Sequence, residues 1–200
     1  MYAQFKASIL LADLIMHNGQ TADPLNPYAK AMKMISSKRK KVDADFEALA
    51  EIEYEAGLYL NPSREVVLPG RLFESMIAEG ARKSKEGKLA LSGTFVDNDP
   101  VIAYDGGPKT LAELKASPAH RLTVNVRVGQ AKVMRCRPIF RNVSADFLIS
   151  LNTDVANEAQ LRKWIEDGLN LVGLGDWRPR HGRGSLTRFE RVSAPLAAVA

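Results

Sequence analysis

The chain has little of what several large classes of protein depend on. Its single cysteine, Cys136, cannot form an internal disulfide and leaves no cysteine pair for a zinc knuckle. The three histidines, His17, His120 and His181, are scattered singly, so no spacing of metal ligands is visible. No apolar stretch approaches the roughly 20 residues that cross a bilayer. We therefore expect a cytoplasmic protein without metal ion, cofactor or membrane segment.

The first residues are not expected to be a secretion signal. Asp13 interrupts their apolar run, and no small-residue cleavage site follows. With 46% apolar residues among 200, the chain can bury one sizeable core. The 28 Lys and Arg exceed the 23 Asp and Glu by a net charge of +5, which permits an acidic partner. Where the cations lie therefore matters more than how many there are.

Alternation of apolar and polar side chains predicts the strands. Between residues 2 and 11 every second side chain is apolar, which indicates a strand with one buried face. Gly129 and Gln130 suit the tight turn of a hairpin. The strands expected on these grounds are residues 2–11, 122–128, 131–141, 143–151 and 185–192.

Capping residues and three-and-four spacing predict the helices. Asn26 followed by Pro27 is typical of a helix start, and Asn157 with Gln160 resembles a capping box. Gly173 stands where a left-handed residue would end the last helix. The helices expected are residues 27–36, a second one carrying Phe46, Leu49 and Ile52, one starting at Pro69 and Gly70, and one from 157 to 172.

Without its insertions this order is strand, helix, strand, strand, helix, strand. It is typical of an α+β fold of the ferredoxin-like or RNA-recognition type, an antiparallel sheet with helices on one face. We expect one domain over residues 1–193, with a helical insertion at about 12–65, an irregular insertion at about 89–120, and a flexible tail at 194–200. The other face of the sheet is left open, so we expect the functional residues on that face.

The strand AKVMRCRPIFR carries an unusual row of cations. A period of two places Arg135, Arg137 and Arg141 on one face and Met134, Cys136 and Phe140 on the other, which is the natural core face. Three guanidinium groups would then face the open side of the sheet, where a phosphate backbone can run along them. The alternative is a solvated face whose arginines pair with Asp and Glu.

The segment LVGLGDWRPRHGRGSLTRFE combines glycines, arginines and one tryptophan. Its glycines would let backbone amides approach a phosphate, its arginines would donate charged hydrogen bonds, and Trp177 could stack on a base. Because the segment follows a helix and precedes a strand, it is neither a Walker loop nor a dinucleotide fingerprint. The alternative is a helix end and a turn held by a packed Trp177.

These landmarks resemble the RAMP superfamily, the repeat-associated CRISPR proteins built on RNA-recognition folds. The glycine-rich loop after the last helix matches in position, and VVLPGRLFESMIAEGARKSKEGK is similar to that family's entry into its first core helix. MHNGQTADPLNP stands in place of the exit loop of its first strand, and it also resembles openings of phage-encoded proteins. The chain is short for a CRISPR backbone subunit.

The resemblance implies binding of single-stranded RNA or DNA by subunits that stack along the strand as a homo-oligomer or filament. Some relatives are instead metal-independent ribonucleases with a histidine as general base, for which His17 and His181 are the candidates here. The residues that the resemblance places against the nucleic acid are Gly70, Arg71, Lys83, Gly173, Gly175, Arg178, Arg180, Gly182 and Arg183.

The sequence therefore predicts a non-enzymatic single-strand-binding protein of RAMP type. A metal-independent endoribonuclease of the same superfamily is the first alternative. The second is a structural or assembly protein, for example of a phage, in which the basic loop contacts an acidic neighbour.

Overall fold

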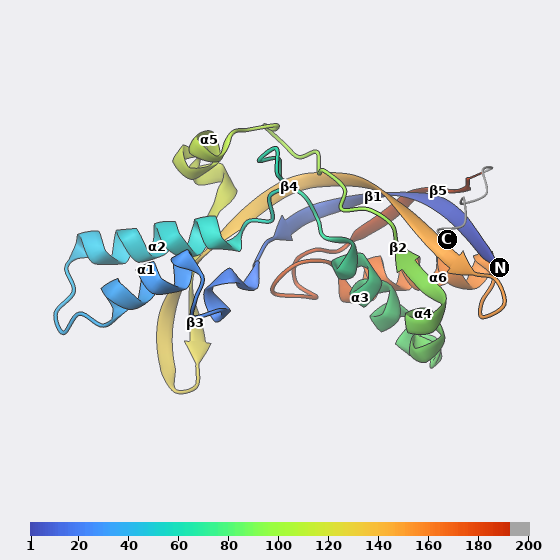
Figure 1. Ribbon diagram of the computed structural model, residues 1–200, viewed down its shortest axis with the longest axis horizontal. Coiled ribbons are helices and arrows are strands. Elements are labelled where there is room, and N and C mark those ends of the chain that lie inside the picture. Colours follow the sequence, from blue (N-terminus) through green and yellow to red (C-terminus); the bar gives the residue numbers. More distant parts are fainter. Residues whose placement is uncertain (193–200) are drawn as a thin grey trace.

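The computed structural model describes residues 1–192, which form one antiparallel sheet with helices packed against it (Figure 1). The tail expected at 194–200 lies outside the described residues. Strands β1 (Tyr2–Ile15) and β4 (Ala131–Asn152) lie side by side, with β5 (Gly184–Arg191) beside β1 and β2 (Thr94–Val96) beside β4. The order β2-β4-β1-β5, with one core helix between β1 and β2 and another after β4, confirms the predicted ferredoxin-like fold.

The core lies between the central strands and two helices, α3 (Gly70–Ala81) and α6 (Glu158–Asp167). Figure 1 shows both helices on the concave side of the arched sheet. β1 and β4 pair from Tyr2 with Asn152 to Ile15 with Ile139, and the side chains of both strands that face the helices are buried. The Phe73 and Phe147 rings stack with centroids 4.3 Å apart. The alternation predicted for residues 2–11 is thus confirmed.

Two strands differ from what the sequence predicts. The strands expected at 131–141 and 143–151 are one strand, β4, which continues through Asn142 although this residue has a left-handed φ of 47°. The second core strand is β2, three residues long, inside the segment expected to be an irregular insertion. β2 holds its place by pairing with residues 149–151 of β4. The hairpin of β3 (Arg121–Val128) and β4 instead projects beyond the core.

That hairpin belongs to a second part of the molecule, which we call the arm. The arm comprises α1 (Pro27–Ser36), α2 (Asp43–Gly57), β3 (Arg121–Val128) and residues 131–138 of β4, and it forms the left end of the molecule in Figure 1. As predicted, the Asn26 side chain caps α1, where it accepts from the Tyr28 N–H at 2.9 Å. β1 extends to Ile15, so the helical insertion starts a few residues later than expected.

The remaining segments are short. α4 (Gly87–Gly93) leads into β2, α5 (Leu111–Ala116) packs against the arm, and a π-helical turn (Gly168–Val172) extends α6. The short 3-10 turns are Gly19–Ala22, Arg82–Ser84 and Pro118–His120. Within residues 1–192 no helix is long and apolar enough to span a membrane.

Candidate nucleic-acid interface

The segment from Gly173 to Arg183, which we call the glycine loop, is folded onto the end of β1. The Asp176 N–H donates to the Ile15 carbonyl at 2.8 Å, and the Leu174 N–H donates to the Gly182 carbonyl at 2.9 Å. Gly175 and Gly182 have φ of 80° and 78°, and a Cβ at either would collide with the backbone of Ile15 or Leu174. These two glycines therefore allow close packing within the protein.

Two of the amide contacts predicted for the loop, and the contact that the resemblance implies for Gly70, need correction for the same reason. The Gly173 N–H donates to the Gly168 carbonyl at 2.8 Å, and the Gly182 N–H donates to Asp13 Oδ1 at 3.2 Å. The Gly70 N–H donates to Asp99 Oδ1 at 2.7 Å. Amides that already donate inside the protein are not available to a phosphate, so the expected backbone cradle is absent at these three positions.

The arginines of the glycine loop point outward. Arg178, Arg180 and Arg183 are all exposed. Arg178 lies 3.8 Å from a Glu79 carboxylate oxygen, whereas Arg180 and Arg183 form no ion pair within the described residues. Trp177 is half-buried, and its ring lies 6.5 Å from that of His181. The structure thus brings the predicted tryptophan, a histidine and unpaired cations together on one loop.

The arginine row of β4 is not the free row that the sequence predicts. Arg137 is buried and lies 3.7 Å from Glu53 and 3.4 Å from Asp176, while Arg135 is paired with Glu53. Arg141 is exposed and lies 2.9 Å from Asp13. The prediction of three unpaired, exposed guanidinium groups is therefore wrong, because carboxylates from distant parts of the chain reach each of them.

The opposite face of β4 is also only partly as predicted. Cys136 and Phe140 are buried, and burial raises the pKa of the Cys136 thiol. Met134 is 57% exposed, although alternation places it on the core face. The reason is geometric: α2 covers the hairpin near Cys136 but leaves the strand open farther out, beside Phe46, which is also 57% exposed.

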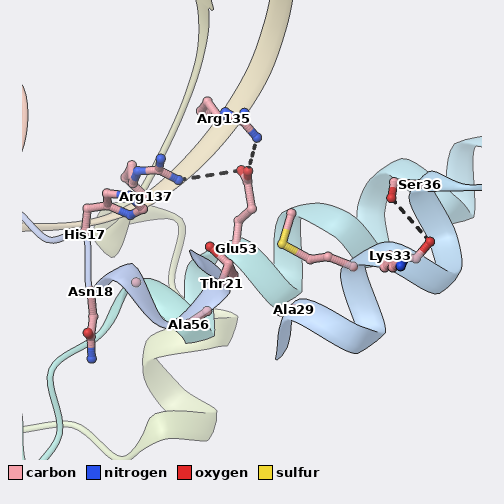
Figure 2. A pocket seen from close by; sticks show the side chains of 12 residues that line it. His17, Asn18, Thr21, Ala29, Lys33, Ser36, Glu53, Ala56, Arg135 and Arg137 are labelled. Carbon is pink, nitrogen blue, oxygen red and sulfur yellow. Dashed lines mark hydrogen bonds and ion pairs between the residues drawn. The ribbon is translucent and has the colours of Figure 1, made fainter. Parts of the chain in front are cut away.

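Within the arm, Glu53 fastens α2 to the edge of β4. Its carboxylate accepts from the Cys136 N–H at 2.9 Å, beyond the point where β1 ends, and it also contacts the two arginines (Figure 2). Around it lies a pocket of about 380 Å³, which we call the arm pocket, bounded by α1, α2 and the edge of β4. His17 and Lys33 line this pocket as well.

A hollow of about 460 Å³, the hairpin groove, separates the glycine loop from the hairpin. Leu122, Val124 and Val126 of β3 form its apolar side. Arg141 of β4 and three residues of the loop form its polar side, namely Trp177, Arg180 and His181. An apolar floor with a tryptophan and arginines around it suits a nucleobase and its flanking phosphates.

A second hollow of about 570 Å³, the helix groove, lies on the other side of Trp177. It is bounded by the end of α3 and the loop, and Lys83 and Arg178 supply its cations, with Glu79 as the opposing acid. The hairpin groove and the helix groove share one lining residue, Trp177. Two of the cations predicted from the first core helix and the loop therefore face each other across one groove.

The hollows continue around the loop to the arm. Gly175 and Asp176 line both the helix groove and a small pocket of about 100 Å³ beside Tyr59. His17 lines this small pocket and also the arm pocket. Arg71 lies above the Tyr59 ring, 5.7 Å from its centroid. We call this series of hollows with shared lining residues, from the hairpin groove to the arm pocket, the band.

The two candidate catalytic histidines lie apart on the band. His181 lines the hairpin groove and His17 lines the arm pocket, and none of the hollows described above is lined by both. Burial lowers the pKa of His17 from its usual value, and the nearby Arg137 guanidinium lowers it further. The predicted possibility that the two imidazoles meet as an acid and base pair finds no contact in the structure.

Sequence reasoning did not identify the acids that organise this surface. Asp13, Glu53 and Asp176 each contact an arginine that was predicted to be free. Asp13 did carry a signal, since it continues the alternation of Ile9 and Leu11 and so places a carboxylate on the apolar side of a strand. A charge at such a position needs a partner, which here is supplied by the glycine loop and Arg141.

We compared the chain with known protein families, curated proteins and solved structures. No family model matches the chain, and no curated protein matches it significantly. Among solved structures the chain is similar to a chain in the cryo-EM structure of the Type III-B Cmr-beta bound to cognate target RNA, with 12% identity and a TM-score of 0.49. The match covers 96% of the present chain and 61% of that chain, so the present chain spans about three-fifths of its length.

Proposed function

We propose that this protein binds single-stranded nucleic acid along the band, in the manner of a RAMP protein. The observation that carries the proposal is the presence of two grooves that are both lined by Trp177, with the cation Arg180, which has no ion pair within residues 1–192, in one of them. Arginine and lysine neutralise phosphates, and an accessible aromatic ring stacks on a base of any sequence. Double-stranded partners have no unstacked base to offer such a ring.

The cations and the ring are expected to act differently. Replacing Arg180 with alanine should lower the slope of log affinity against log salt by about 0.7, because one phosphate is no longer neutralised. Trp177→Ala should weaken binding by about 1 to 3 kcal/mol while leaving the slope nearly unchanged, because stacking releases no counterions. Both are measured by titrating a labelled single strand at several salt concentrations.

A matched control is Arg162→Ala on α6, which removes the same charge from an exposed pair with Glu166 outside the band. Its slope should stay that of the wild-type protein. If the loop variants bind with unchanged affinity and slope while circular dichroism shows them folded, the loop is a structural turn and the proposal fails. The mass of the complexes formed on longer strands tests whether copies of the chain line up along one strand, as we also propose.

A second candidate function is a metal-independent endoribonuclease. It is favoured by one contact, the 2.8 Å approach of Asp13 Oδ2 to His181 Nδ1, because a carboxylate that orients an imidazole is how many general bases are held. Incubation of labelled RNA in EDTA tests it. Product ends bearing a 2′,3′-cyclic phosphate, lost in His181→Ala, would establish the nuclease; intact RNA would exclude it.

A further inference from the structure

Asp13 and His181 form a fixed pair at the rim of the hairpin groove. Besides approaching His181 Nδ1 at 2.8 Å, the Asp13 carboxylate accepts from the Gly182 N–H and lies 2.9 Å from Arg141. The side chains of Asp13 and His181 are only 18% and 17% exposed. The imidazole is thus held by a strand on one side and by its own loop on the other.

This pairing determines which ring nitrogen carries hydrogen. An ionised carboxylate can only accept, so His181 Nδ1 must be the donor. In the neutral imidazole the other nitrogen, Nε2, then has a free lone pair and can only accept. Nε2 has no hydrogen-bond partner among residues 1–192, and the ring lines the hairpin groove.

His181 is chemically distinct within that groove. The other described side chains that line it are Leu122, Val124, Val126, Arg141, Trp177 and Arg180. Alkyl side chains form no hydrogen bonds, and the guanidinium and indole groups can only donate. Of these side chains in the hairpin groove, His181 alone can accept a hydrogen bond.

The position of this acceptor relative to Trp177 indicates what it would contact. The two rings lie 6.5 Å apart, centroid to centroid. A base stacked on Trp177 would carry its sugar at the edge of the stack, and the imidazole of His181 is the neighbouring ring. The sugar hydroxyl that RNA has and DNA lacks is the 2′-hydroxyl, which can donate to a nitrogen lone pair.

We propose that His181 Nε2 accepts a hydrogen bond from the ribose 2′-hydroxyl of the nucleotide stacked on Trp177, so that this protein selects RNA over DNA. The inference rests on the proposed single-strand binding and adds the residue that reads the sugar. The arginines contact phosphates, which both nucleic acids share, so they cannot supply this selectivity. A group that recognises a donor by accepting from it discriminates against strands that lack the donor.

Three labelled strands of one base sequence provide the test: RNA, DNA, and RNA with 2′-fluoro sugars. The fluoro sugar keeps the RNA-like ring pucker but has no hydrogen to donate. The wild-type protein should bind RNA about three- to tenfold more tightly than the 2′-fluoro strand, which is the effect of one hydrogen bond. In His181→Ala the affinity for RNA should fall to that for the 2′-fluoro strand, while the affinity for DNA should stay the same.

Two further variants separate this contact from a loss of structure. Arg180→Ala should weaken binding of all three strands by the same factor, since it removes a cation that neutralises a phosphate. Asp13→Asn can donate to His181 Nδ1 and so permits the tautomer that carries hydrogen on Nε2. That tautomer cannot accept from the 2′-hydroxyl and can only donate to its oxygen, so the preference for RNA should differ from that of the wild-type protein, with DNA bound as before. Thermal unfolding of each variant is measured alongside.

Equal affinity of the wild-type protein for RNA and the 2′-fluoro strand would overturn the inference, even if binding depends on Trp177 and the band function stands. Failure of all three strands to bind would instead overturn the proposed function itself. Cleavage of RNA that stops in His181→Ala would support the contact, because a base that removes the 2′-hydroxyl proton must first accept that hydrogen bond.

Discussion

The sheet core and the arm are held together by different forces. In the core the Phe73 and Phe147 rings are fully buried and stacked, and α6 adds the buried Trp164. In the arm, α1 buries no residue, and α2 buries Tyr54 but also relies on the carboxylates of Glu51 and Glu53, which pair with arginines of the strands. Apolar packing is insensitive to salt, whereas ion pairs at a partly open surface are screened by it. The arm is therefore the part of the protein expected to loosen first.

The largest effect is expected in the core. Phe147→Ala should lower the free energy of unfolding by about 3 to 5 kcal/mol, because it leaves a cavity against Phe73 that the sheet cannot fill. Urea denaturation followed by circular dichroism measures the change. Phe95→Ala on β2, where the side chain is 59% exposed, is the control and should cost less than about 1 kcal/mol. Similar losses in the two variants would contradict the assignment of the core.

A smaller and local effect is expected from Glu53→Gln. The amide keeps the size of the side chain but loses the charge that faces Arg135 and Arg137, so the cost should be about 1 to 3 kcal/mol. If the arm opens locally, the Cys136 thiol, which is buried beneath α2, should be alkylated faster while the core stays folded.

Glu47→Gln on the exposed side of the same helix is the matched control and should leave the alkylation rate of Cys136 unchanged. Raising the salt concentration should accelerate alkylation of the wild-type protein and have little further effect on Glu53→Gln. An alkylation rate that changes with neither salt nor the Glu53 substitution would show that apolar contacts hold α2 against the hairpin.

The smallest effect concerns His17, where β1 meets the arm. Its pKa is lowered by burial and by Arg137, so as the pH falls the unfolded chain takes up this proton before the folded protein does. Stability should therefore be lost as the pH drops below about 6.5, the ordinary pKa of histidine. His17→Gln should lose less stability than the wild-type protein between pH 7.5 and 5.5 in urea titrations. Parallel curves would mean that His17 is freely hydrated.

Local patterns predicted the elements whose signals are complete within a few residues. The cap at Asn26, the box formed by Asn157 and Gln160, and the alternation of residues 2–11 each involve neighbours in sequence. β2 was missed because three residues are too few to show a period. Its place in the sheet depends on pairing with a strand more than fifty residues later, at Leu151.

In the candidate site, too, features set by neighbouring residues could be predicted, and contacts between distant residues could not. Alternation correctly groups Arg135 and Arg137 on one side of a strand, but it carries no information about which acid will arrive there. Glu53 lies 82 residues before Arg135 in the chain, so their pairing follows from the fold alone. The loop was identified because its residue types are clustered, whereas the role of Asp13 emerges only when residue 181 is folded onto it, 168 positions later.

The central strand pair also determines the order in which the protein can be assembled during synthesis. β1 is made before its two neighbours in the sheet, β4 and β5, which begin at Ala131 and Gly184. A nascent chain must therefore carry an apolar strand without a partner until more than a hundred further residues have been made. Closing contacts this far apart is slow, and an unpaired strand can join other chains in the meantime. Newly made copies are thus most vulnerable to aggregation before β4 has left the ribosome.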